Sequence, residues 1–260
     1  MITFMHLCRS PSNQVMSRLA LFALVFLGLA MTGLPSWMSG RLTIAQAQAS
    51  VKMTIQAGFD GFCKQDRWIP LRVELENNGV QVEGRIEAKI PRTIGSESIY
   101  ITQVVLPNIS RKEIRLYVYP EGYLNELPVS FMVGNKTLAQ EKIRLNCLGL
   151  TDTLFGVLAG SDAAFAILTN VDPPNGAATV AELEISDIPE TSRVMEALDV
   201  LVVSDTDTGS FSAKQRAALA GWVSGGGRLW IAGGSSWQKT TAGLGNLLPL
   251  IPDHTQILAN

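Results

Sequence analysis

The sequence predicts two domains of different class behind an N-terminal export segment: an all-β sandwich, then an α/β domain with a parallel sheet. Three observations predict this order. Apolar and polar residues alternate with period two from Val51 to about Leu148. From Gly149 onward, continuous apolar runs alternate with helical segments. The first 50 residues combine arginines, an apolar stretch and a small-residue tail.

Composition and charge narrow the functional classes. The chain has 260 residues, of which 47% are hydrophobic and 17% charged, values typical of a packed protein and not of a disordered one. Its formal net charge is −2 and it has no basic run, so nucleic-acid binding is not predicted. The glycine triplet at 225–227 precedes a strand, whereas a phosphate-binding loop follows one. No cofactor is predicted.

Residues 1–49 have the pattern of a signal peptide. Arg9 and Arg18 precede the apolar stretch Leu19–Leu34, which is shorter than the ~20 residues that a membrane span prefers. The segment Ala45-Gln46-Ala47-Gln48-Ala49 then offers two small-residue cleavage sites. We expect cleavage; the alternative is an uncleaved N-terminal anchor. Both place the rest of the chain outside the cytoplasm, in the cell envelope.

Residues 51–148 are predicted to form an immunoglobulin-like β-sandwich, because about seven short strands fit into about 100 residues. The turn signal Asn77-Asn78-Gly79 indicates a hairpin between the runs that precede and follow it. The turn Val133–Lys136 indicates another. The remaining predicted strands are Val51–Ala57, Ile99–Leu106, Glu113–Tyr119, Leu127–Val133 and Thr137–Cys147.

Two cysteines flank this sandwich. Cys63 precedes the second predicted strand and Cys147 ends the last. Export makes a disulfide chemically feasible, but the spacing fits two unpaired thiols equally well. Two cysteines without a histidine cluster do not supply the four ligands of a zinc site, and no metal is predicted.

Residues 149–260 are predicted to form the α/β domain. A helix over 212–224 is the clearest, because Ser212 caps it and the glycines at 225–227 end it. A second helix is expected over 163–168 with Ser161 or Asp162 as its N-cap, and a third over 189–198. The predicted strands are Leu154–Ala159, Thr179–Ile185, Asp199–Val203 and Arg228–Ala232.

The runs Leu198–Asp205, Ser212–Gly227 and Arg228–Gly234 resemble the class I glutamine amidotransferase-like (flavodoxin-like) fold. The chain is also similar to exported, membrane-associated, uncharacterised proteins in which such a domain follows an immunoglobulin-like domain. In that group the chain usually continues, often to a C-terminal membrane helix. The resemblance therefore implies that the α/β domain is incomplete here.

The resemblance also gives a test for catalysis. An active amidotransferase of this class uses a cysteine nucleophile with a histidine and an acid. After the fourth predicted strand, Ser235 and Ser236 stand where that cysteine is expected, and His254 is the only histidine beyond the signal segment. We therefore expect no catalytic activity. The alternative is a serine-dependent hydrolase or a small-ligand-binding enzyme that uses the strand-end loops of the α/β domain, with Ser235 and His254 as the catalytic candidates.

Polar residues follow three of the predicted strands, at the sheet edge where α/β proteins bind ligands. Ser161 follows the first strand, Asp205 and Asp207 follow the third, and Ser235 follows the fourth. The two aspartates are open to two interpretations, a divalent-cation site and a polar loop in which Asp caps a turn. The sequence thus predicts a binding or scaffolding protein of the cell envelope. Its partner would be a protein or another envelope component, and it would associate with the membrane through the N-terminal segment or a helix beyond Asn260.

Overall fold

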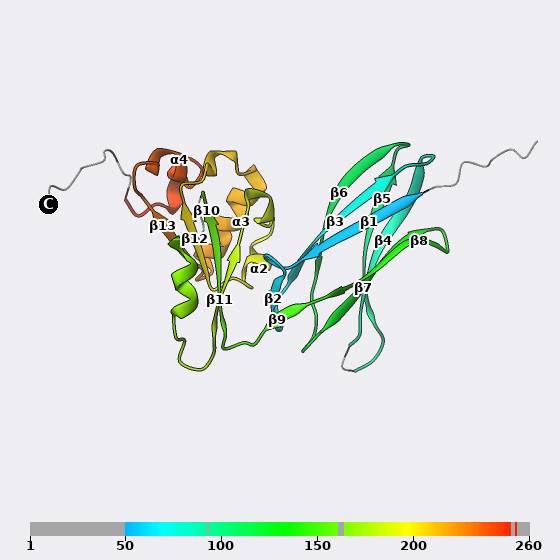
Figure 1. The fold of residues 1–260 in the computed structure, drawn as a ribbon, viewed down its shortest axis with the longest axis horizontal. Coiled ribbons are helices and arrows are strands. Elements are labelled where there is room, and N and C mark those ends of the chain that lie inside the picture. Colours follow the sequence, from blue (N-terminus) through cyan, green and yellow to red (C-terminus); the bar gives the residue numbers. More distant parts are fainter. Residues whose placement is uncertain (1–49, 93, 161–163, 251–252, 254–260) are drawn as a thin grey trace, which may run out of the picture. The chain divides into compact units, whose positions relative to one another are not determined.

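Two antiparallel sheets form the β-rich region of the computed structural model, which describes residues 50–92, 94–160, 164–250 and 253 (Figure 1). The first sheet has the order β1-β3-β6, and its strands are β1 (Val51–Ala57), β3 (Ile69–Asn77) and β6 (Ser110–Val118). The second has the order β5-β4-β7-β8, and its strands are β5 (Ser98–Leu106), β4 (Val82–Ile90), β7 (Glu126–Val133) and β8 (Lys136–Arg144). The two sheets share one hydrophobic cluster and so form a β-sandwich, as the sequence predicts.

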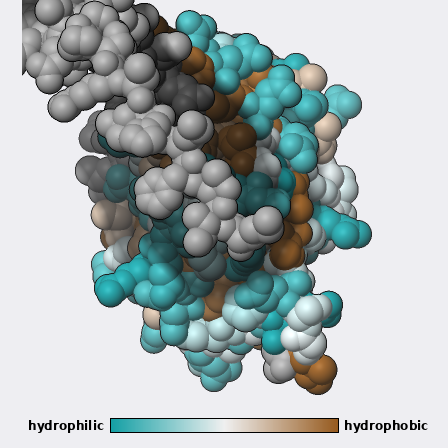
Figure 2. Space-filling view, turned by 90° about the vertical axis from the view of Figure 1, so that its right-hand side faces the viewer, coloured by the Kyte–Doolittle hydropathy of each residue, from teal (hydrophilic) through white to brown (hydrophobic). Residues whose placement is uncertain are grey.

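The period-two pattern of the sequence packs these sheets. In β3 the residues Leu71, Val73 and Leu75 are buried, while the polar residues between them are half-buried. They share the hydrophobic cluster with Ile86 and Phe131 of the other sheet. Outward positions are mostly polar, and Figure 2 shows one face of the molecule on which hydrophilic residues cover most of the coloured surface.

The predicted hairpin around Asn77-Asn78-Gly79 is wrong. Strand β3 pairs with β1 and β6, and strand β4 pairs with β5 and β7, so the turn carries the chain from one sheet to the other. Asn77 is fully buried and explains the crossing. Its side-chain amide donates to the carbonyls of Val80 (2.8 Å) and Pro107 (2.7 Å), which fixes the turn between the sheets.

A two-stranded parallel sheet adds to the sandwich. It pairs β2 (Phe62–Lys64) with β9 (Asn146–Leu148), so the predicted strand Thr137–Cys147 is divided between β8 and β9. Cys63 lies opposite Cys147 in this ladder, with a Cα–Cα distance of 4.3 Å, and a disulfide bond joins them. Of the two interpretations of these cysteines, the structure has the paired one.

The C-terminal region contains a four-stranded parallel sheet in the order β11-β10-β12-β13. The strands are β10 (Thr153–Ala159), β11 (Ala178–Glu182), β12 (Val200–Ser204) and β13 (Arg228–Ala232). Its α-helices are α2 (Ser192–Met195), α3 (Ala213–Ser224) and α4 (Trp237–Thr241). The 3₁₀ segments are η3 (Ala166–Asn170), η4 (Ile185–Asp187), η5 (Thr208–Ser210) and η6 (Gly245–Leu247). A β domain followed by a small α/β domain confirms the predicted fold class.

Helix α3 begins as predicted, because the Ser212 hydroxyl accepts from the amide of Gln215 and the Gln215 side chain accepts from the amide of Ser212. The other two helices were predicted wrongly in extent. The segment expected at 163–168 is the 3₁₀ turn η3, and Pro173 and Pro174 soon after it prevent an extension. The segment expected at 189–198 is helical only in α2. The proposed N-caps Ser161 and Asp162 lie outside the described residues.

The predicted strand Thr179–Ile185 also ends early. Strand β11 stops at Glu182, because the side chains of Glu184 and Asp187 form a reciprocal capping box around η4.

Contacts along the chain group Ala47–Asn260 into one compact unit, which contains both the sandwich and the α/β domain. The predicted signal segment lies outside the described residues. Among the residues described, no helix has the length and hydropathy needed to cross a membrane.

Candidate functional site

The order of the parallel strands defines where a ligand site is expected in the α/β domain. From β10 the chain moves to β11 on one side and later to β12 on the other, so the connections that follow β10 and β12 leave in opposite directions. Open α/β sheets bind ligands at this point, beyond the carboxyl ends of the strands. A hollow of about 610 Å³ lies there, lined by Leu158 and Ala159 of β10, Thr206 and Ser210 after β12, and Gln215 of α3.

A second hollow of about 620 Å³ adjoins the first. Its walls come from the sandwich, including Gln56, Arg72 and Arg144, and from the α/β domain, including Glu182 and Asp187. Three residues line both hollows: Arg115 of β6, Glu184 and Ser186. We call the two hollows together the seam groove. Each has the volume of an ordinary small-ligand pocket.

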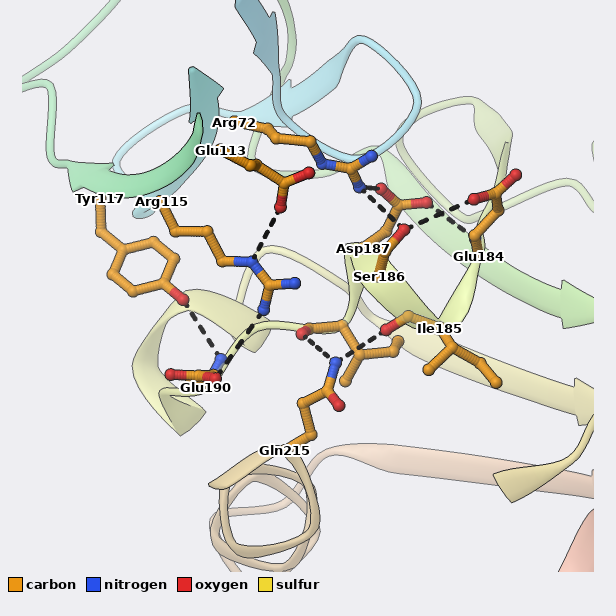
Figure 3. Close-up of polar contacts among 11 residues, drawn as sticks. Arg72, Glu113, Arg115, Tyr117, Glu184, Ile185, Ser186, Asp187, Glu190 and Gln215 are labelled. Carbon is orange, nitrogen blue, oxygen red and sulfur yellow. Dashed lines mark hydrogen bonds and ion pairs between the residues drawn. The ribbon is translucent and has the colours of Figure 1, made fainter. Parts of the chain in front are cut away.

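Arg72 fixes one wall of the seam groove. Its guanidinium donates to the Ser186 hydroxyl at 3.2 Å and forms an ion pair with Asp187 (Figure 3). Both charged side chains are about one quarter exposed. The Asp187 carboxylate also accepts from the backbone amide of Glu184 at 2.7 Å. The ion pair therefore attaches the 3₁₀ turn η4 to strand β3 of the sandwich.

Arg115 points toward two carboxylates and is held tightly by neither. Its guanidinium lies 3.6 Å from Glu113 of the same strand and 4.0 Å from Glu190 of the α/β domain (Figure 3). Lys214 also lies 3.4 Å from Glu190. Because Arg115 lines both hollows and makes only long ion pairs, it is the cation in the groove best placed to meet a bound group.

Two neutral contacts complete this wall. The backbone amide of Glu190 donates to the Tyr117 hydroxyl at 3.2 Å. The buried Gln215 amide donates to the carbonyls of Ile185 (2.7 Å) and Ile188 (3.0 Å), which holds η4 against the start of α3. The groove walls are therefore preformed by hydrogen bonds from both domains of the chain.

A second set of contacts between the two domains is buried. Lys64, 5% exposed, donates to both carboxylate oxygens of Asp199 at 2.7 and 2.6 Å. Asp199 also accepts from the backbone amide of Leu154 at 2.8 Å, at the start of β10. Cys63 precedes Lys64 in β2, and its disulfide with Cys147 belongs to the hydrophobic cluster of the sandwich.

The tight loop Gly58–Phe62 adds an apolar contact to this set. Phe59 is fully buried within the hydrophobic cluster of the α/β domain, together with Leu154 and Leu158 of β10. Gly58 adopts φ +75° and lies so close to the Phe62 carbonyl that a Cβ atom would clash with it. We call the disulfide, the Lys64–Asp199 pair and Phe59 together the buried junction.

Among the predicted ligand residues that the structure describes, Asp205, Asp207 and Ser235 do not line the seam groove. Asp205 is exposed, with φ +47°, after the end of β12. A hydrogen bond from the Ser236 hydroxyl, and then the charge of Lys239, hold the pKa of Asp205 below its usual value. Lys239 donates to the Asp205 carbonyl at 3.0 Å. Ser235 is exposed in the turn before α4.

Asp207 adopts the turn-capping arrangement that the sequence left open. Its carboxylate accepts from the backbone amide of Gly209 at 3.0 Å, at the start of η5. Among the described residues there is no group of three or more His, Cys, Asp or Glu side chains that could hold a metal ion. Ser161 and His254 lie outside the described residues.

The residues of the groove that sequence reasoning missed are Arg72, Arg115 and Tyr117. Strand pairing would have indicated these residues, because Arg72 lies directly opposite Arg115 in the β3–β6 ladder. Like charges in that position are unfavourable unless acids neutralise them, and two of these acids, Asp187 and Glu190, come from the α/β domain.

Comparisons with known proteins identify the sandwich region only. Residues 50–146 match the model of a domain of unknown function (DUF8726), which covers the sandwich. No curated protein sequence matches the chain.

Several solved structures match part of this chain. The alkylpurine DNA glycosylase AlkC of Pseudomonas fluorescens matches 38% of this chain and 31% of its own, with 15% identity and a TM-score of 0.30. A glucanotransferase of Paenibacillus sp. matches 60% and 20%, with 7% identity and a TM-score of 0.32. β-Glucosidase 3B of Thermotoga neapolitana matches 38% and 16%, with 12% identity and a TM-score of 0.27. The chain spans about a third or less of the length of these proteins.

Proposed function

We propose that this chain is an exported, non-catalytic protein of the cell envelope that binds a partner protein in the seam groove. The observation that carries the proposal is the shared wall of the two hollows. Arg115 comes from the sandwich, Glu184 and Ser186 come from the α/β domain, and all three line both hollows. A groove built from both domains requires that the chain hold them in a fixed arrangement, which is the property of a scaffold.

The N-terminal pattern and the disulfide support an extracytoplasmic location. The apolar stretch Leu19–Leu34 is followed by two signal-cleavage sites. The Cys63–Cys147 disulfide fits an oxidising compartment, since cytosolic proteins rarely keep such bonds. The resemblance to membrane-associated proteins with an immunoglobulin-like and an amidotransferase-like domain points the same way.

The charges of the groove indicate the class of partner. Arg72, Arg115 and Arg144 share its walls with the acids Asp60, Glu182 and Glu184. A single-sign ligand, such as a polyphosphate, would meet acids as well as arginines. A polypeptide segment that carries both signs of charge can pair with each in turn. We therefore propose a protein segment as the ligand.

The experiment is site-specific photo-crosslinking in cells. A photoreactive residue replaces Gln56, which is exposed and lines the groove, or Gln140, which is exposed on β8 and does not line it. We expect one discrete protein adduct from position 56, none from position 140, and loss of the adduct when Arg115→Glu is added. Equal adducts at both positions, or none at position 56, would contradict the proposal.

The alternative function is a serine-dependent hydrolase at the carboxyl ends of β12 and β13. The observation that favours it is the hydrogen bond between Ser236 and Asp205 beside Lys239. The test is turnover of ester and amide substrates by the purified chain, with Ser235→Ala and Ser236→Ala as matched variants. If the unmodified chain turns over a substrate and either variant abolishes that turnover, the non-catalytic proposal is contradicted. If the unmodified chain and both variants have the same rate, the non-catalytic proposal is supported.

A further inference from the structure

The two edge strands of the larger sandwich sheet differ in how they are protected from pairing with another strand. Strand β8 carries four charged residues, Lys136, Glu141, Lys142 and Arg144, and its ladder with β7 contains a register shift. Strand β5, with the sequence SIYITQVVL, has no charge, no proline and no glycine over nine residues. Soluble proteins use charges, prolines and bulges to block edge-to-edge association, and β5 has none of these in its own sequence.

The outward face of β5 is apolar except at Gln103. Ile99, Ile101 and Val105 are 49%, 51% and 45% exposed, while Val104 and Leu106 point into the core. Three half-exposed aliphatic residues in one row lose water-accessible area when another strand is added beside them.

The backbone of β5 is available for pairing. Within the residues that the structure describes, β5 pairs with β4 alone. Lys112 donates to the Val105 carbonyl at 3.4 Å, and the Asn77 side-chain amide lies 3.5 Å from the Leu106 carbonyl. Both contacts lie at the C-terminal end of the strand.

We propose that two copies of this chain associate edge to edge through β5, as an antiparallel pair with Thr102 on the two-fold axis. Full overlap of the nine residues places Ser98 opposite Leu106 of the second copy, and this fixes the register. In that register Ile99 lies opposite Val105, and Ile101 lies opposite Gln103. The arrangement is self-complementary, as a two-fold interface requires. It adds roughly one backbone hydrogen bond per residue pair.

The charges on the next strand support a second copy as the occupant. In the β4–β5 ladder, Lys89 lies beside Ile99 and Glu83 lies beside Val105. Across the four strands, one row of residues therefore runs from Lys89 and Ile99 of one copy to Val105 and Glu83 of the other. By the same register, the row that begins at Glu87 ends at Arg85. In both rows the charges at the two ends are of opposite sign, with the two β5 strands between them, so this register places no like charges at the two ends of a row.

The first test is sedimentation of the purified full chain in one detergent, with Gln103→Lys and Gln140→Lys as matched variants. Both glutamines are exposed, one on β5 and one on β8. We expect the unmodified chain and Gln140→Lys to dimerise with the same dissociation constant, and Gln103→Lys to raise that constant at least about tenfold. A monomeric unmodified chain, or equal constants for all three proteins, would overturn the proposal.

A second test fixes the register. In a Cys8→Ser background, which removes the cysteine outside the disulfide, Ile101→Cys and Gln103→Cys chains are oxidised separately and as a mixture. The register pairs position 101 with position 103, so the mixture is expected to cross-link faster than either variant alone. Equal rates would contradict the register, and a folding defect in either variant is detected by loss of the native Cys63–Cys147 bond.

Discussion

The sandwich and the α/β domain meet in two places that differ in kind. At the buried junction, a lysine that is 5% exposed and a fully buried phenylalanine connect them, and a disulfide within the sandwich holds the strand β2 that carries the lysine. At the seam groove, the Arg72–Asp187 pair is about one quarter exposed and the ion pairs of Arg115 are 3.6 to 4.0 Å long. The buried contacts of the junction contribute most of the stabilising free energy between the two domains. The charges of the seam groove stay accessible to solvent. The junction holds the two domains together, and the groove is open to a ligand.

The largest effect is expected from removing the disulfide. The Cys63→Ala/Cys147→Ala variant frees a loop whose ends are 84 residues apart, and in the chain-entropy account this costs about 4–5 kcal/mol of unfolding free energy. Urea unfolding measures it. A loss below about 1 kcal/mol would mean that the remaining junction contacts already fix β2 against β9.

Phe59→Ala comes next. Phe59 fills space within the α/β cluster from a loop that belongs to the sandwich, and its truncation is expected to cost about 3–4 kcal/mol. The apolar surface that it exposes should appear as binding of a hydrophobic dye before global unfolding. An unchanged unfolding midpoint would show that the Gly58–Phe62 loop does not hold the two domains together.

The two interdomain aspartates allow a matched comparison. Asp199→Asn and Asp187→Asn each keep a side chain that accepts a backbone hydrogen bond but remove the charge. For Asp199→Asn we expect a loss of about 2–3 kcal/mol, because Lys64 stays charged and buried; 29% exposure of Asp199 moderates the effect.

Asp187→Asn is expected to cost about 0.5–1 kcal/mol, since water reaches both members of its pair. Thermal unfolding of the two variants side by side measures the difference. Equal losses would abolish the distinction between the buried junction and the seam groove.

The smallest effect concerns pH and the residues that lead from β9 into β10. The carboxylate of Asp152 accepts from the backbone amides of Ala177 and Gly149, at 2.9 and 2.8 Å, and these bonds lower its pKa. A carboxylate whose pKa is lowered by folding stabilises the folded state at pH values above its unfolded-state pKa. This stabilisation is lost as the pH falls through the folded-state pKa. The destabilisation caused by Asp152→Asn should therefore be full at neutral pH and shrink below about pH 4. A constant difference across that range would contradict this assignment.

The sequence predicted where strands and helices lie better than it predicted which strands pair with each other. Leu71, Val73 and Leu75 indicate a strand by their spacing alone, and the cap at Ser212 locates a helix start. The same spacing does not say which strand pairs with which, so the turn at Asn77 was interpreted as a hairpin. Only the burial of its amide between two sheets reveals the crossing.

The candidate site was less predictable for a related reason. Arg72 and Arg115 alternate with apolar residues, as solvent-exposed charges do, and their acid partners lie about 75 to 115 residues away in the chain. Lys64 has no sequence feature that separates it from a surface lysine. Contacts across such separations depend on the tertiary arrangement, which period and propensity do not encode.

Scanning calorimetry of the full chain tests the central claim most directly. If the buried junction joins the sandwich and the α/β domain into a single cooperative unit, the chain unfolds in one transition whose van't Hoff and calorimetric enthalpies agree. The Phe59→Ala/Asp199→Asn variant, which removes the junction contacts that cross between the two domains, should then unfold in two transitions. Two separate transitions in the unmodified chain would contradict the account.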